Sequence, residues 1–499
     1  MRHKRLPHML VFASSMLFLS LLFTLTSTTL AAGTGATPMP SAMPSASPLP
    51  YPAYGAARPD IIRTRVAPGV PPSITLAQAI AIAAARSPVF ASAVATYEQT
   101  RAGYAVAKSA IFPNVSANVS ASRTYGSNLG VPNGIGGGSS VAGAVGANGM
   151  YTQDGAKAVL SQLIYDGGRV IAGIRSAQYL SVAGRDTLDR ALQTLAFTVA
   201  TNYYGALQAR SQVALDARIV LQNEEQEKLV QAQIRAGSAA PSDIYQQKFQ
   251  TDQARATLIA DQGAQIAALA AFATTLGLNP QIRVVPVENT PKNPAAMLLR
   301  SPVLDYGKAI ARALLLRPDY LSALSTLESA QANLHYAKLA KFPSLTANAS
   351  TGYQSTLPDG SKLRNVQSLG ATLTIPIFDQ GQTNYQVALA AAKLDQSKAS
   401  LLQTRLRVYS DVRTALANLV SAQAGVEQAQ AEVRSASVAL AAAQAQYKVG
   451  VATLLDLVTA QVNDATGRTA LLKAVYNLRR AEQQYRYALG TNMSAAGVK

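Results

Sequence analysis

Apolar and polar residues alternate one by one in two parts of the chain, each directly after a Phe-Pro pair. The two pairs are Phe112-Pro113 and Phe342-Pro343. Strict alternation is typical of a strand that has different surroundings on its two faces. A second strand-like stretch follows each of the first two. The pattern therefore predicts four strands, at about residues 114–125, 156–165, 344–354 and 366–378.

The predicted strands have the length and composition of membrane strands. Each has about 10 residues, enough to cross a bilayer when the strand is tilted. One face carries Ser, Thr and Asn, and the other carries Val, Leu, Ile and Ala, although Gln162 falls on the apolar side. Tyr125 and Tyr353 lie at strand ends, where interfacial aromatic residues are expected. We expect the polar face to line a water-filled interior.

Two long proline-free segments, residues 169–235 and 382–448, have helical periodicity instead. At ~1.5 Å per residue each helix would reach about 100 Å. In the second segment, apolar residues recur in steps of four and three, which predicts a coiled-coil seam. The seam consists of Val408, Val412, Ala415, Leu419, Ala422, Val426, Ala429, Val433, Ala436, Leu440, Ala443 and Tyr447.

The corresponding seam of the first long helix is interrupted by polar residues, which predicts a wetter or looser contact there. These residues are Asn202, Asp216, Asn223 and Glu227. Both long helices end at glycines, Gly237 and Gly450, the residue type expected just after a helix C-terminus. A second helix then runs back in each case. We therefore expect two antiparallel helical hairpins, 169–276 and 382–489.

The chain contains one unit twice. Ser87-Pro88 recurs as Arg317-Pro318 at the spacing that separates the two Phe-Pro pairs, and shorter helices precede both pairs. Tyr-Asp-Gly-Gly-Arg (165–169) recurs as Phe-Asp-Gln-Gly-Gln (378–382). In these turns Asp166 and Asp379 are expected to cap the following helix, and Gly168 and Gly381 to permit the turn. The predicted organisation is a first repeat 73–279, a linker 280–303, a second repeat 304–490 and a tail 491–499.

The N-terminal region is expected to be an export signal followed by an extended lead-in. Residues 1–32 combine a basic start, a long apolar stretch and small residues suited to cleavage. Residues 33–72 are rich in Pro, Ala and Ser and show no periodicity. The glycine-rich connection 126–155 lacks the Gly-Lys-Ser/Thr ending of a phosphate-binding loop, so we interpret it as a surface loop.

The composition argues against most chemistry. The chain has no cysteine, and outside residues 1–32 its one histidine is His335. A thiolate or histidine metal site is therefore not expected, and no cofactor is predicted. The formal charge is +18, but Lys and Arg are scattered singly, so we expect no nucleic-acid binding. No nucleophile–base pair is recognisable, and the chain is not expected to be an enzyme.

Four strands cannot close a barrel, and an open edge in lipid leaves backbone groups without hydrogen bonds. Other copies of the chain must therefore complete the sheet. Two copies would give eight strands and a barrel filled by side chains, whereas three would give twelve and leave a lumen. The helical hairpins would continue the wall away from the membrane. The expected function is passage through a tube.

These features together resemble the TolC family of outer membrane efflux proteins, also called outer membrane factors. The resemblance covers about residues 73–490 and depends on the doubled Phe-Pro junctions, the two strand-to-helix turns and the Tyr447–Gly450 to Asp456 segment. It implies a mainly α fold with a small membrane β-barrel portion, in which a homotrimer forms a twelve-stranded barrel and an α-helical barrel. It also implies the outer membrane of a Gram-negative bacterium, a large periplasmic part, and coupling to a periplasmic adaptor and an inner membrane pump.

The resemblance also suggests functional residues at the hairpin turns. Asp243, Asp456 and Tyr447 match positions at the periplasmic aperture. Adaptor tips of this family dock near the turns, which here contain Gly237, Val449, Gly450 and Thr453. Ala452 and Thr459 stand where some relatives carry a basic and a second acidic residue. Asp243 and Asp456 can equally serve to stabilise the first turns of their helices.

Two other functions are open to a chain with long helices. An exported coiled-coil stalk or adhesin predicts a continuous heptad pattern, which the alternating segments at 114–125 and 344–353 interrupt. A periplasmic adaptor predicts one hairpin flanked by small β domains, whereas this chain has two hairpins. The pattern favours the channel over both.

Overall fold

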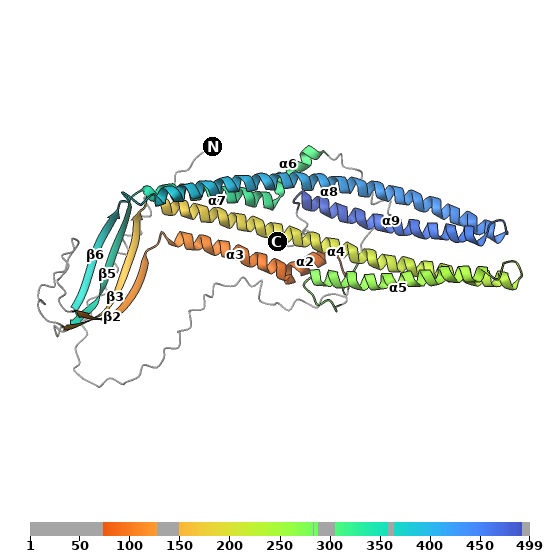
Figure 1. Cartoon of the computed structure of the whole chain (residues 1–499), viewed down its shortest axis with the longest axis horizontal. Helices are drawn as coiled ribbons and strands as arrows, with labels where there is room; N and C mark the ends of the chain where they lie inside the picture. Colours follow the sequence, from red (N-terminus) through yellow and green to blue (C-terminus); the bar gives the residue numbers. More distant parts are fainter. Residues whose placement is uncertain (1–72, 127–148, 283, 288–304, 358–363, 492–499) are drawn as a thin grey trace, which may run out of the picture. The chain divides into compact units, whose positions relative to one another are not determined.

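The computed structural model describes residues 73–126, 149–282, 284–287, 305–357 and 364–491, all of which lie in the unit 63–499. Its membrane-type strands form one antiparallel sheet in the order β2-β3-β5-β6, at one end of the long helices (Figure 1). The strands are β2 (Asn114–Gly126), β3 (Gly149–Tyr165), β5 (Ser344–Leu357) and β6 (Arg364–Thr374). The central pair, β3 and β5, joins the first half of the chain to the second.

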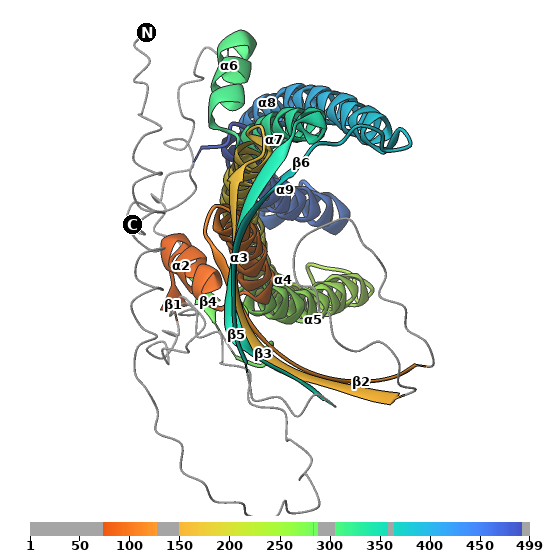
Figure 2. The ribbon, with the colours of Figure 1, turned by 90° about the vertical axis from the view of Figure 1, so that its left-hand side faces the viewer.

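Near the helices, the register of the sheet places mainly apolar residues on one face and mainly small or polar residues on the other. Residues that lie opposite each other on neighbouring strands share a face. One row across the sheet is Val115, Leu160, Ala349 and Leu369. The adjacent row is Asn114, Ser161, Asn348 and Gly370. Figure 2 shows that the sheet carrying these two faces is curved.

Two strands have bounds that differ from the expected ones. β3 begins at Gly149, not near 156, because residues 149–155 pair with β2, although their sequence has no clear alternation. β6 ends at Thr374, before the expected 378, and Pro376 lacks the N–H that would continue the ladder. Gln162 is the polar residue that the sequence places on the apolar face of β3. Its side-chain amide donates a hydrogen bond to the Ile111 carbonyl at 3.0 Å, next to a bulge in β3.

The element order of the first half recurs in the second half. Two short helices precede each strand pair, and a long hairpin follows it (Figure 1). The first half has α2 (Leu76–Arg86), α3 (Pro88–Ser109), α4 (Arg169–Arg235) and α5 (Asp243–Thr275). The second half has α6 (Tyr306–Leu316), α7 (Pro318–Lys338), the 3₁₀ turn η2 (Leu339–Lys341), α8 (Gln382–Lys448) and α9 (Leu454–Ala488).

The seam of α8 lies against α9 for most of its length. Its buried members are Val408, Val412, Ala415, Leu419, Val426, Ala429, Leu440 and Ala443. Leu419 and Val426 pack with Leu478 and Ala481 of α9. At the start of this seam, well inside α8, Val408 and Val412 also pack with Ala313 of α6. Alanine at many seam positions lets the two helices approach closely.

The base of the first hairpin has a separate apolar core. Ala83 of α2, Val199 of α4 and Phe272 of α5 are all fully buried in it. A short parallel pair, β1 (Ser73–Ile74) and β4 (Val285–Pro286), closes this core. The expected linker 280–303 therefore contains a strand, which sequence alone did not indicate because two residues are too few to show alternation.

Some predicted segments lie outside the described residues. These are the signal 1–32, the lead-in 33–72, most of the loop 126–155, most of the linker and nearly all of the tail. Among the described helices, α5 is long and apolar enough by length and composition to cross a membrane, and the bent pair α2–α3 passes the same test. α5 is rich in alanine and pairs with α4 along the hairpin, so we assign it to the hairpin.

Candidate functional site

The two strand-to-helix turns hold their aspartates in the same way. Asp166 accepts hydrogen bonds from the N–H groups of Gly168 at 3.0 Å and Val170 at 2.6 Å. Asp379 accepts from Gly381 at 3.1 Å and Thr383 at 2.8 Å. Gly168 and Gly381 have φ values of 88° and 83°, the left-handed region that favours glycine. Each turn therefore fixes the direction in which a long helix leaves the sheet.

The Phe-Pro junctions lie beside these turns, but their two phenylalanines differ in surroundings. Pro113 and Pro343 directly precede β2 and β5. Phe342 packs on Gly167, where an added Cβ would come within 2.6 Å of the Phe342 Cβ. Phe112 is 64% exposed, compared with 51% for Phe342. At the second turn a hollow of about 650 Å³ is lined by Asp379, Gln380, Gln382, Tyr385, Gln386 and Leu389.

Glycines with positive φ reverse the chain at both hairpin turns. Gly237 has a φ of 75° and Gly450 a φ of 76°. The amide that follows each glycine bonds back to the helix, Ser238 N–H to the Gln233 carbonyl and Val451 N–H to the Gln446 carbonyl, at 2.9 Å each. This is the C-terminal capping arrangement expected of glycine at these positions.

Asp456 takes part in a capping box at the start of α9. The Thr453 hydroxyl accepts from the Asp456 N–H at 3.3 Å, and Asp456 Oδ2 accepts from the Thr453 N–H at 2.9 Å. The hydroxyl of Thr453 also donates to Asp456 Oδ2 at 2.7 Å. These bonds hold the pKa of Asp456 below its usual value, so the carboxylate stays charged in neutral and mildly acidic solution. Asp243 is the corresponding first-turn residue of α5.

Tyr447 joins the two hairpin turns. Its hydroxyl donates to Gln233 Oε1 of α4 at 2.9 Å, and its ring packs on Val230, Leu454 and Val458. Burial raises the pKa of the Tyr447 hydroxyl, and the negative charge of Asp243 raises it further. Of the three residues predicted at an aperture, Tyr447 and Asp243 are therefore close enough to interact electrostatically with each other. Asp456 instead hydrogen-bonds with Thr453 at the start of its own helix.

The turns also present apolar side chains to solvent, of which the sequence analysis named only Val449. Near the first turn these are Tyr245 and Phe249, and near the second they are Val449, Val451 and Leu455, all at least 60% exposed. In sequence they resemble ordinary hairpin residues, because their exposure depends on how the two turns pack. Clustered exposed apolar residues mark a surface that binds a partner.

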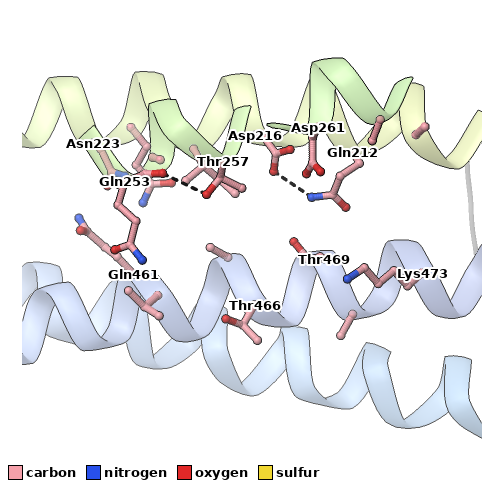
Figure 3. Close-up of a pocket in the computed structure, with 18 of the residues that line it drawn as sticks. Gln212, Asp216, Asn223, Gln253, Thr257, Asp261, Gln461, Thr466, Thr469 and Lys473 are labelled. Atoms are coloured by element: carbon pink, nitrogen blue, oxygen red, sulfur yellow. Dashed lines mark hydrogen bonds between the residues drawn. The ribbon is translucent and has the colours of Figure 1, made fainter. Parts of the chain in front are cut away.

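Behind the turns, a polar groove of about 790 Å³ lies between the first hairpin and α9 (Figure 3). Asp216 of α4 and Asp261 of α5 lie side by side on one wall, and Thr469 and Lys473 of α9 lie on the opposite wall. Burial and the neighbouring Asp261 carboxyl, which adds negative charge, raise the pKa of Asp216 to about 6. Within the described parts of the chain, no group of three or more His, Cys, Asp or Glu side chains is arranged for a metal ion.

Comparisons with known proteins agree with this architecture. A family model described as "Outer membrane efflux protein" matches residues 79–278 and 309–491. Outer membrane efflux protein BepC of Brucella suis biovar 1 (strain 1330) is 24% identical over 324 residues, which cover 64% of this chain and 68% of BepC. Cation efflux system protein CusC of Escherichia coli (strain K12) is 25% identical over 300 residues, which cover 59% of this chain and 64% of CusC. The chain thus matches about two thirds of the length of these relatives.

Solved structures share the fold. The outer membrane protein VceC of Vibrio cholerae superimposes with a TM-score of 0.71 at 19% identity, covering 84% of this chain and 96% of VceC. A crystal structure of CusC gives a TM-score of 0.70 at 20% identity, covering 84% of this chain and 92% of CusC. Similarity of this extent at such low identity establishes the arrangement of helices and strands.

Proposed function

Because the chain belongs to the outer membrane efflux protein family, we propose that three copies of it form a channel-tunnel through which solutes cross the periplasm and the outer membrane. The observation that carries the proposal is the sheet order β2-β3-β5-β6, which leaves β2 and β6 with one unpaired edge each. In lipid, unpaired backbone groups cost several kcal/mol each. Three copies would pair every edge in a twelve-stranded barrel with a lumen.

The junction between the two halves of the chain suggests how neighbouring copies meet. Within one chain, β3 pairs with β5, and Phe342 covers Gly167 at the first turn. If the two halves are copies of one unit, β6 pairs with β2 of the next copy, and Phe112 of that copy covers Gln380. The 64% exposure of Phe112 and the open hollow beside Gln380 support this arrangement.

Disulfide cross-linking tests the assembly cleanly, because the chain has no cysteine. The double variant Phe112→Cys/Gln380→Cys should form covalent oligomers on oxidation, visible on denaturing gels. The control Ser176→Cys/Ser329→Cys replaces two hydroxyls 3.0 Å apart within one chain and should stay at the mass of one chain. A trimer that never cross-links through the first pair would contradict the interface, and a monomer in mild detergent would contradict the trimer itself.

We propose that the exposed apolar residues at the hairpin turns dock a periplasmic adaptor, which connects the channel to an inner membrane pump. The surface comprises Tyr245, Phe249, Val449, Val451 and Leu455, around Gly237, Gly450 and Thr453. The printed names of CusC and BepC support an efflux role. Asp243, Tyr447 and Asp456 would then surround the periplasmic mouth.

An export assay tests the docking surface. In a host that lacks this protein, the wild-type chain should restore tolerance to toxic solutes. Val451→Asp places a charge at the turn, on a residue that is 77% exposed, and should abolish that tolerance. The matched control is Val438→Asp, on the same hairpin and 70% exposed but away from the turn. Wild-type tolerance with Val451→Asp, at equal trimer levels in the outer membrane, would rule out docking at this surface.

A further inference from the structure

The polar groove behind the turns is a departure from the coiled-coil pattern. At this level of the second hairpin the seam residues are small, with Ala429 of α8 buried and Ala474 of α9 partly buried. At the matching positions of the first hairpin stand Asp216 of α4 and Asp261 of α5. The buried carboxylate of the second hairpin, Asp464, lies nearer the start of α9 and pairs with Arg468. A seam made only to hold two helices together has no need of two carboxylates.

One carboxylate oxygen in this groove is buried without a partner. Asp216 is 4% exposed, and its Oδ1 accepts a hydrogen bond from Gln212 Nε2 at 2.8 Å. Asp216 Oδ2 and Gln212 Oε1 are both buried and have no hydrogen-bond donor in the described structure. Both residues line the groove. Burying a polar atom without a partner costs free energy, so this arrangement calls for a positively charged group.

The basic residues of the groove do not supply that group at contact distance. Lys473 and Arg480 of α9 line the same groove. Among the described residues, neither makes an ion pair within 4.0 Å of Asp216 or Asp261, and Arg480 donates to Asn477 instead. Lys473 lies on the opposite wall (Figure 3). The space between the walls is large enough to admit water and an ion.

We propose that the groove binds a divalent cation, with Ca²⁺ the best fit, between α4 and α5. The protein ligands are Asp216 Oδ2 and the Asp261 carboxylate, and water completes the coordination. Both donors are carboxylate oxygens, which suit Ca²⁺ and Mg²⁺ and disfavour soft metals. Ca²⁺ accepts irregular geometry, whereas Mg²⁺ needs a near-ideal octahedron. With only two carboxylates, the Kd belongs in the range of about 10⁻⁴–10⁻³ M.

The bound ion would join the two helices of the first hairpin where apolar contacts are missing. Asp216 belongs to α4, and Asp261 belongs to α5. An ion shared by both helices replaces the alanine contact that the second hairpin makes at this level. The first hairpin would thereby become stiffer when divalent cations are present, and this effect is independent of what the channel carries.

Equilibrium dialysis of the purified full-length assembly against radioactive Ca²⁺ tests the site. The wild-type chain should bind about one more ion per chain than Asp216→Asn or Asp261→Asn. Saturating Ca²⁺ should also raise its Tm by several degrees, and both variants should lose that shift. The control Glu225→Gln removes an equal charge from an exposed position of the same helix and should bind as the wild type does.

The double variant Asp216→Ala/Asp261→Ala gives an independent check, because it copies the residues of the second hairpin. It should fold at least as well as the wild-type chain without Ca²⁺ and show no Ca²⁺-dependent rise in Tm. Equal Ca²⁺ binding by the wild-type chain and this variant would overturn the proposal. The proposal would also be overturned if the wild-type chain bound neither Ca²⁺ nor Mg²⁺ at concentrations several times the expected Kd. In that case a proton shared by Asp216 and Asp261 would neutralise the pair.

Discussion

Three carboxylates that are important in this fold accept hydrogen bonds from backbone N–H groups next to a helix start. Asp166 and Asp379 each accept two such bonds at the strand-to-helix turns, and Asp456 closes a capping box with Thr453. Such bonds stabilise the charged form and the first turn of the helix together. A carboxylate placed at a channel mouth by its cap is therefore both fixed in position and charged.

The proposed role of Asp456 at the mouth can be separated from its role as a cap. Asp456→Ala removes the charge, so single-channel conductance should rise or cation selectivity should fall in planar bilayers. Thr453→Ala weakens the cap by about 1 kcal/mol but keeps the charge, so selectivity should stay near wild type.

Because the pKa of Asp456 is lowered, the selectivity that it provides should persist at pH 5 and be lost only as the pH falls below the usual carboxyl range. Recordings of Asp456→Ala that match wild type would exclude a mouth role.

Residue-level chemistry was predictable from sequence where it is local. The hydrogen bonds that Asp166 and Asp379 accept from the first turns of α4 and α8, and the turns at Gly237 and Gly450, follow from residue types at fixed offsets, although the N-cap positions themselves are Gly168 and Gly381. The partner of Tyr447 was not predictable, because Gln233 lies on a different hairpin. The polar residues in the first seam indicated a looser contact, but the pairing of Asp216 with Asp261 depends on how two helices are rotated against each other.

Four glycines with positive φ end the hairpin helices, and their surroundings divide them into two pairs. Gly237 and Gly450, at the hairpin turns, have nothing within 4 Å of an added Cβ. Gly277 and Gly490, at the bases, are crowded by the backbone of Arg86 and Arg317. Arg317 is 1% exposed and held by Asp319 and Asp411, so it cannot move aside.

This difference predicts unequal costs for the same substitution. Gly450→Ala should lower the free energy of unfolding by about 1–2 kcal/mol, the cost of a left-handed alanine alone. Gly490→Ala should cost clearly more, because its Cβ would lie 2.8 Å from Arg317 Cα and N. Thermal unfolding of the detergent-solubilised protein measures both, and equal Tm losses would mean that the base of the second hairpin is less tightly packed than described.

Element boundaries were predictable where the sequence changes period. α4 and α8 have the bounds that periodicity and glycine indicate, Arg169–Arg235 and Gln382–Lys448. The start of β3 was not predictable, since its first residues become a strand only through pairing with β2. The same holds for the pair β1–β4, whose members are far apart in the chain.

At the scale of the whole molecule, the sheet has two faces of different polarity. The row of Val115, Leu160, Ala349 and Leu369 lies on its apolar face, and the strand order leaves the edges of β2 and β6 unpaired. In the proposed barrel the apolar face meets lipid, and the opposite face meets water in the lumen. The long hairpins, with α4 and α8 of 67 residues each, extend from the strand-to-helix turns.

The two faces of β2 should respond differently to the same charge. Val119→Arg places a guanidinium on the lipid side of β2, which costs about 2–4 kcal/mol near the bilayer midplane. Membranes should then contain little heat-resistant trimer. Ser120→Arg, one residue along on the other face, should assemble normally, and similar yields of the two variants on gels of membrane fractions would argue against the assigned faces.

The unpaired edges of β2 and β6 have a consequence for inheritance. In the proposed trimer every copy must offer two intact strand edges, so one defective copy prevents the barrel from closing. An allele whose product keeps intact hairpins but a broken β6 would still be recruited and would sequester healthy partners. Such an allele should act dominantly when expressed beside the normal one, whereas a deletion should be recessive.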